Sequence, residues 1–327
     1  MGMRDDDTLW SGRGELPEDL AKLEADLSRL AVPEEPDWDQ VRSPRPVFAL
    51  YAWAAAAALM LVAVAGQWLV RDGWHVEALA GSPSVRGLAI GGRLALGGSL
   101  TTDEASRARL LVRGLGRVDL EPGSVLRRVP GGRGERRLAL EHGTLHASII
   151  APPRQFVVET RVGIATDLGC AYTLSVDPQG HGRLEVTSGR VALGGRGLES
   201  FVPAGAWCPL SPEGVGLPRR DYATDAFLMA LAAYDQRDGA ATVLDTVLAT
   251  AEASDALTLW HLLPRVAGPE RERVARRIAS LIEVPTDVPI ERVLSLEPDA
   301  LDAWWAAIGM GPAAEWRAGR QKKVFGL

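Results

Sequence analysis

The apolar run VFALYAWAAAAALMLVAVAGQWLV, residues 47–70, divides the chain into two unequal parts. It is 24 residues long, has no charged side chain, and carries Gln67 as its one polar group of note. An α-helix of this length extends about 36 Å, and the hydrocarbon core of a bilayer is about 30 Å thick. Tyr51, Trp53 and Trp68 lie near the two ends, where aromatic rings favour the interface. We therefore expect a single transmembrane helix here, because a core helix or a signal peptide would be shorter or less uniformly apolar.

Basic residues beside this run predict its orientation. Arg42 and Arg45 precede the run, whereas Arg71 follows it with Asp72 directly after. Basic residues are enriched on the cytoplasmic side, so their count narrowly favours a cytoplasmic N-terminus. We expect a single-pass protein of the inner (cytoplasmic) membrane, with the lipid bilayer as a partner and residues 71–327 on the periplasmic, extracytoplasmic side.

The charge of the chain is concentrated before the run. The 327 residues have a net charge of −6, and residues 1–46 alone hold 12 acidic and six basic side chains. No clustered basic patch of the kind that binds nucleic acid follows. The two cysteines are Cys170 and Cys208. An exported region permits a disulfide between them, and two separate buried thiols are the alternative that the sequence leaves open.

Residues 1–46 form an acidic arm with one amphipathic helix, expected over residues 17–30. Its apolar positions fall at helical spacing, at Leu16, Leu20, Leu23, Leu27 and Leu30. One helix of this length is marginal alone in water, so the stripe favours a partner. Membrane-surface helices are basic and this one is acidic, which favours a protein. A disordered leader is the alternative.

Residues 71–218 change to short runs that alternate apolar and polar positions. Turn residues separate these runs every 8 to 12 residues, as at Pro122-Gly123, Gly131-Gly132 and Gly194-Gly195. The pattern is typical of an all-β domain of short antiparallel strands. Within it, Glu121-Pro122-Gly123-Ser124 predicts a type II turn, because Gly123 stands where the backbone angle φ is positive.

Several segments of this region occur in a fixed order. They are GRVDLEPGS (116–124), LALEHGTL (138–145), FVVET (156–160), DLGCAYTLSV (167–176), VTSGRV (186–191) and VPAG (202–205). This order resembles the FecR domain, over about residues 84–207. The usual Leu-Gly-Thr-x-Phe of that family is Leu168-Gly169-Cys170-Ala171-Tyr172 in this chain. We expect structural roles at Pro122, Gly123, Gly143, Leu168, Gly169, Cys170, Tyr172, Gly189 and Gly205.

Residues 219–327 have the period of helices. The pattern predicts helices at 224–238, 240–251, 255–263, 270–282, 290–296 and 298–308, as a small bundle or stacked hairpins. The tryptophans of this region form either its core or an exposed binding face, and the core is favoured. They are Trp260, Trp304, Trp305 and Trp316.

The sequence lacks the motifs of catalysis and of cofactor binding. His142 and His146 are four residues apart, but on a strand that spacing spans about 13 Å, too far for two ligands of one metal ion. We therefore expect no enzyme activity, no cofactor and no metal site.

Taken together, these patterns predict a membrane-anchored α+β protein of several domains. Its parts are the arm (1–46), the transmembrane helix (47–70), an all-β FecR-like domain (71–218), solenoid- or sandwich-like, and a helical domain (219–327). The resemblance implies a single-span signalling protein whose arm binds an extracytoplasmic-function sigma factor, although 46 residues are few for such a module. The β domain would then meet an envelope protein or ligand. The alternative is a non-catalytic envelope scaffold without a sigma factor.

Overall fold

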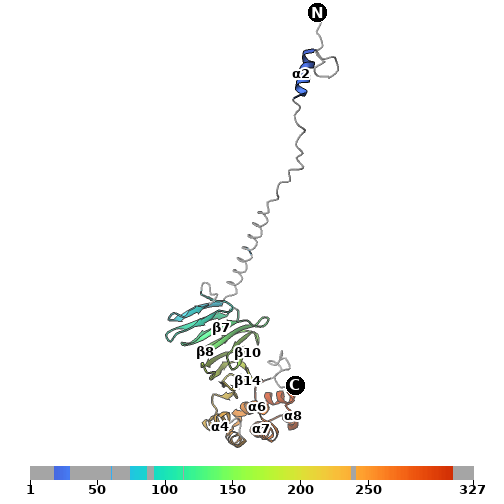
Figure 1. Cartoon of the computed structure of the whole chain (residues 1–327). Helices are drawn as coiled ribbons and strands as arrows, with labels where there is room; N and C mark the ends of the chain where they lie inside the picture. Colours follow the sequence, from blue (N-terminus) through green and yellow to red (C-terminus); the bar gives the residue numbers. More distant parts are fainter. Residues whose placement is uncertain are drawn as a thin grey trace. The chain divides into compact units, whose positions relative to one another are not determined.

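The computed structural model describes residues 18–29, 60, 74–86, 92–112, 114–236 and 241–311 (Figure 1). By its internal contacts the chain divides into two compact units, Met1–Ala63 and Val64–Leu327. In the first unit, helix α2 (Glu18–Ser28) lies where the leucine spacing predicts a helix. It begins with Glu18 and Asp19, whose charges favour the positive end of the helix dipole.

The second unit contains 17 described strands in two sheets that share one long strand. Sheet A follows the order β3-β1-β5-β6-β8-β11-β12-β15, and β15 also pairs with β16 and β17. Its strands are β1 (Trp74–Ala80), β3 (Arg93–Leu94), β5 (Arg107–Val112), β6 (Gly116–Leu120), β8 (Arg136–Ile149), β11 (Ala171–Val176), β12 (Gly182–Ser188), β15 (Ala206–Ser211), β16 (Gly214–Val215) and β17 (Arg219–Arg220).

Sheet B follows the order β2-β4-β7-β8-β9-β10-β13-β14. Its further strands are β2 (Ser84–Arg86), β4 (Ser99–Thr101), β7 (Val125–Val129), β9 (Phe156–Glu159), β10 (Ile164–Asp167), β13 (Arg190–Gly195) and β14 (Leu198–Pro203). The alternation of apolar residues explains both sheets. In β5, for example, Ala108, Leu110 and Val112 are buried and the residues between them are more exposed. The buried faces of both sheets contribute to one hydrophobic core.

Strand β8 passes from one sheet into the other at Gly143. Before this glycine, β8 pairs with β7 in sheet B, and after it with β6 and β11 in sheet A. Gly143 has a φ of +103°, and a Cβ atom on it would lie 2.1 Å from Ser124 Oγ. The same Ser124 hydroxyl accepts a hydrogen bond from the Thr144 N–H at 2.9 Å. Gly143 and a bulge at Glu141, where the register between β7 and β8 shifts, therefore make the corner at which the strand changes sheets.

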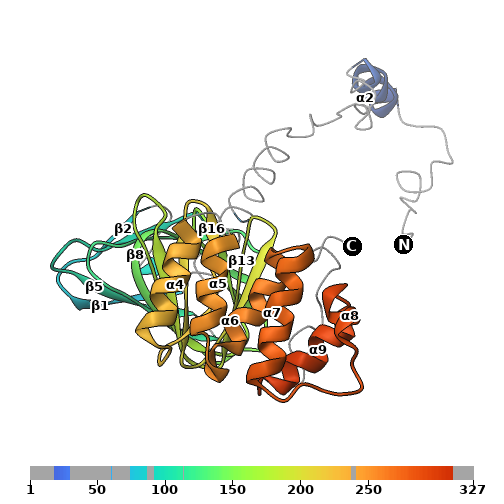
Figure 2. The same cartoon turned by 90° about the horizontal axis from the view of Figure 1, so that it is seen from below.

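The helices of the C-terminal region lie where the sequence predicts them. They are α4 (Asp225–Gln236), α5 (Ala241–Thr250), α6 (Ala256–Leu262), α7 (Gly268–Leu281), α8 (Ile290–Leu294) and α9 (Pro298–Ala307), with short 3₁₀ turns η2 (Ala253–Asp255) and η3 (Leu263–Arg265). Figure 2 shows α4, α5, α6 and α7 running beside one another. Trp260, Trp304 and Trp305 are buried, as the core interpretation predicted, and Trp316 lies outside the described residues.

These helices cover the end strand of sheet B. Among the described residues, β14 pairs with β13 alone, and the Phe201 N–H on its other side donates to His261 Nε2 of α6 at 2.9 Å. His261 Nδ1 lies 2.9 Å from the Leu257 carbonyl oxygen, so the neutral ring with its proton on Nδ1 satisfies both contacts. Arg265 donates to Ser200 Oγ and to the Gly216 carbonyl. The helical region thereby protects an edge that would otherwise expose unpaired backbone groups.

The fold class expected from the sequence requires correction. The structure is a mixed fold with one large sheet system and packed helices. None of the helices that the structure describes is long and apolar enough to cross a membrane, so the expected transmembrane helix is not supported. The run at 47–70 itself lies outside the described residues apart from Met60.

The expectation of short antiparallel strands was also wrong for one strand pair. Strand β8 has 14 residues and pairs with β9 in parallel. Its buried positions are Leu138 and Leu140 before Gly143 and Leu145, Ala147 and Ile149 after it, so the alternation changes parity at the glycine while the strand continues. Gly194-Gly195, expected as a turn, ends β13, and the turn itself is Arg196-Gly197.

The corner at Gly143 yields a stability prediction. We expect Gly143→Ala to lower the free energy of unfolding by more than about 3 kcal/mol, because it adds a clash with Ser124 to the cost of a positive φ. Gly123→Ala is the matched control, since Gly123 has a φ of +68° and open space around its missing Cβ. Its expected cost is about 1–2 kcal/mol. Denaturant unfolding measures both, and equal losses would contradict this account of the corner.

Candidate functional site

Helix α2 carries the first candidate surface, the leucine stripe, defined as Leu20, Leu23 and Leu27. Leu23 is 55% exposed and Leu27 is 57% exposed, and no described residue of α2 is buried. The expected stripe also included Leu16 and Leu30, which lie outside the described residues. Exposed leucines at helical spacing on an acidic helix are typical of a face that packs against another protein.

The positions that carry the resemblance to the FecR domain lie in turns, at close backbone contacts or in the core. The left-handed backbone of Gly123, after Pro122, fits the expected type II turn, and Gly205 with a φ of +69° forms the turn between β14 and β15. Gly189 approaches the opposite backbone closely, since a Cβ atom on it would lie 2.0 Å from the Gly169 carbonyl oxygen. Leu168 is half-buried against the core.

Asp167 and Cys170 form a buried pair within this motif. The Cys170 thiol donates to Asp167 Oδ2, and the Gly169 N–H donates to Asp167 Oδ1 at 2.7 Å. Burial raises the pKa of Asp167 to about 6, and burial together with the Asp167 charge raises the pKa of the Cys170 thiol. A raised thiol pKa disfavours the reactive thiolate, which fits a buried thiol that packs in the core.

The other residues near Asp167 and Cys170, and the remaining cysteine and histidine, also have structural contacts. Tyr172 is buried in the core, and burial raises its pKa. Cys170 and Cys208 are both free and buried, so the structure selects separate thiols over a disulfide. His146 lies 2.8 Å from Thr173 Oγ1 and 3.3 Å from Glu121 Oε1, which gives it protein partners within sheet A. In the described part of the chain, no group of three or more potential ligands is placed to hold a metal ion.

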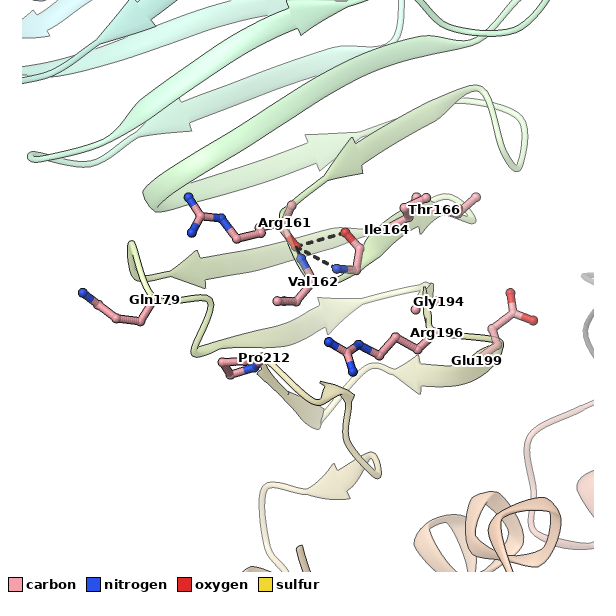
Figure 3. Close-up of a pocket in the computed structure, with 12 residues that line it drawn as sticks. Arg161, Val162, Ile164, Thr166, Gln179, Gly194, Arg196, Glu199 and Pro212 are labelled. Atoms are coloured by element: carbon pink, nitrogen blue, oxygen red, sulfur yellow. Dashed lines mark hydrogen bonds between the residues drawn. The ribbon is translucent and has the colours of Figure 1, made fainter. Parts of the chain in front are cut away.

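The second candidate surface is a cavity at one end of the β strands, of about 680 Å³ (Figure 3). We call it the turn cavity, because residues of several turns line it: Thr160, Arg161, Val162, Gly163, Ile164, Thr166, Gln179, Gly194, Gly195, Arg196, Glu199 and Pro212. Cavities of this size hold small molecules in many proteins. Its polar side chains offer charges and hydrogen-bonding groups.

The sequence did not predict that arginines line this cavity. Arg161 and Arg196 are 35 positions apart in the sequence, and no local pattern indicates that their turns meet. The one usable signal was Arg196-Gly197 between two alternating runs, which predicts a two-residue hairpin turn. The adjacent Gly194-Gly195 is also a turn signal, and the turn was predicted there instead.

The buried Asp167 predicts a pH dependence of stability. A folded-state pKa of about 6, above its ordinary value of 3.8, means that the folded chain binds the proton more tightly. This stabilisation is complete below about pH 4 and is lost as pH rises through 6, with a span of up to about 3 kcal/mol. We expect Asp167→Asn to unfold at higher denaturant than the wild type at pH 7.5, and at a similar concentration at pH 4.

Asp103→Asn is the control with the opposite sign. Hydrogen bonds from Ser106 and Ala105 lower the pKa of Asp103, so its contribution is present at neutral pH and is lost on acidification. A wild-type advantage over Asp167→Asn that grows with pH would contradict the assignment.

Comparison with known proteins places part of the chain in a family. Residues 98–192 match the family model described as FecR protein. A comparison with curated proteins gave no match. Two crystal structures of a protein described as a "putative anti-sigma factor" from Parabacteroides distasonis are similar to part of the chain. One shows 14% identity and covers 43% of this chain and 74% of that one, and the other shows 16% identity with 46% and 73% coverage. Both have a TM-score of 0.34.

The family match lies within the region in which the order of short motifs predicted it. The matched residues begin before β4 and end within β13, so they include the corner at Gly143 and the pair Asp167–Cys170. The match to the FecR protein family covers residues 98–192, less than a third of the chain.

Proposed function

We propose that this protein is a non-catalytic regulator that binds an extracytoplasmic-function sigma factor through the leucine stripe of α2. The single observation that carries the proposal is the exposure of Leu23 and Leu27 in a chain that also holds a FecR-family segment. An exposed apolar face on a short helix gains its stability from a partner. The FecR family indicates the class of partner.

The negative charge of the N-terminal region indicates what kind of partner surface would bind it. Residues 1–46 carry all of the net charge of −6, and α2 itself begins with two acidic residues. A complementary partner offers an apolar groove bordered by basic side chains, since complementary charge guides association and apolar burial supplies affinity.

The remaining parts of the proposal concern place and signal. FecR proteins are generally membrane-associated, and we place this protein at the cell membrane on that basis. How the chain meets the bilayer falls outside the described residues. In this proposal the β region meets the envelope protein or ligand that provides the signal.

The double variant Leu23→Ala/Leu27→Ala tests the proposal. Alanine preserves helix formation and removes the apolar side chains, so the loss reports on packing against the partner. Two buried leucines contribute about 3 kcal/mol in total, and we expect the dissociation constant for the sigma factor to rise about a hundredfold. Titration of full-length protein with the purified sigma factor measures it.

Ala25→Gln is the matched control, because Ala25 lies on the opposite side of α2 from the leucine stripe and is exposed. We expect its affinity to equal that of the wild type. Binding that is unchanged in the double variant would refute the stripe as the interface, and full-length protein that recovers no sigma factor from cells would favour the envelope scaffold.

A further inference from the structure

The turn cavity has features of a built ligand site that the proposed function does not use. It is lined by the β9–β10 turn and the β13–β14 turn, with Gln179 from the β11–β12 turn and Pro212 from the β15–β16 turn (Figure 3). Binding residues are often placed on loops that a rigid scaffold positions. What distinguishes this cavity is the way in which two arginines are held at its wall.

The first arginine, Arg161, stands on a turn that Thr160 fixes. The Thr160 hydroxyl donates to the Gly163 carbonyl at 3.0 Å and accepts from the Gly163 N–H at 3.0 Å. The Thr160 N–H donates to the same carbonyl at 2.8 Å. Arg161 itself is exposed and makes no hydrogen bond or ion pair with any residue that the structure describes. The turn therefore fixes the backbone of Arg161, and no described residue occupies its guanidinium.

The second arginine, Arg196, stands on a strained turn. Arg196 and Gly197 connect β13 to β14 with φ values of +50° and +80°, the backbone of a type I′ turn. Asparagine or glycine is preferred at the first of these positions, and another side chain there stores strain of order 1 kcal/mol. Such strain at a cavity wall is typical of positions kept for function.

Glycines bring the two turns together. A Cβ atom on Gly195 would lie 2.6 Å from the Val162 carbonyl oxygen, and a Cβ atom on Gly163 would lie 3.2 Å from the Gly194 carbonyl oxygen. The absence of side chains at these positions lets the two turns approach each other closely. Two cations consequently line one cavity, although they lie far apart in the sequence.

We propose that the turn cavity binds a small hydroxylated anion, a sugar-sized molecule that bears a carboxylate or a phosphate group. Arg161 and Arg196 bind the anionic group, because guanidinium donors match the geometry of both oxyanions. Gln179 and Thr166 also line the cavity, and their side chains are of the kind that donates to and accepts from hydroxyl groups. The volume of about 680 Å³ accommodates one or two sugar units.

Calorimetric titration of the full-length protein tests this proposal with three probes. Glucuronate carries a carboxylate, glucose 6-phosphate carries a phosphate, and glucose is neutral. We expect saturable binding of at least one anionic probe, weakened by added salt, and no binding of glucose. Binding of glucuronate alone assigns a carboxylate ligand, and binding of glucose 6-phosphate alone assigns a phosphate ligand.

Arg161→Gln and Arg196→Asn are each expected to weaken binding of the anionic probe at least about tenfold. Asparagine suits the left-handed turn, so Arg196→Asn retains or raises the unfolding midpoint, and lost binding cannot be attributed to misfolding. Arg127→Gln is the matched control, because Arg127 is an exposed arginine of sheet B whose guanidinium pairs with Glu141 at 3.4 Å.

Three results would overturn the proposal: no saturable binding of either anionic probe, equal binding of glucose, or wild-type affinity in both cavity variants. The proposal does not depend on α2, so a failure here leaves the sigma-factor proposal intact.

Discussion

The turn of strand β8 at Gly143 is the constraint on which the second unit depends. This strand belongs to sheet B before the glycine and to sheet A after it, so it links the buried faces of both sheets. A side chain at this position would overlap Ser124, whose hydroxyl instead bonds the next residue of the strand. Every later strand extends one of the two sheets from this corner, and the placement of the turns at their ends follows from it.

The helical region covers the edge strand β14, which the described strands of the sheets leave unpaired on one side. His261 accepts from the backbone of β14, and Arg265 donates to Ser200 on the same strand. Ser200 directly follows Glu199, which lines the turn cavity, so the covering helices and the cavity share one strand. This arrangement explains why helices follow the β strands in this unit: they satisfy an edge whose backbone would otherwise be exposed. It also gives the cavity a fixed wall.

Local patterns predicted much of the fold and little of the cavity. Strand alternation and helical spacing predict individual elements, because both depend only on residues that are near one another in the sequence. The burial of Trp304 and Trp305 was predicted from the same local patterns. The continuous strand at Gly143 was not predicted, because the alternation changes parity at this glycine and the sequence on its two sides indicates two separate short strands. The placement of Arg161 and Arg196 along one cavity was not predicted, because it depends on backbone contacts between turns that are distant in sequence. The leucine stripe was predicted because the spacing of apolar residues along a helix is visible in a short stretch of sequence.

The central functional claim is that α2 binds a sigma factor, and the chain offers a direct probe of it. Lys22 lies on α2, and the other lysines, Lys322 and Lys323, stand near the C-terminus. Amine-directed cross-linking in intact cells, followed by mass spectrometry of linked peptides, therefore reports the neighbour of α2. The account predicts Lys22 linked to an extracytoplasmic-function sigma factor. Efficient cross-links from Lys22 to other proteins, with the sigma factor present and unlinked, would contradict it.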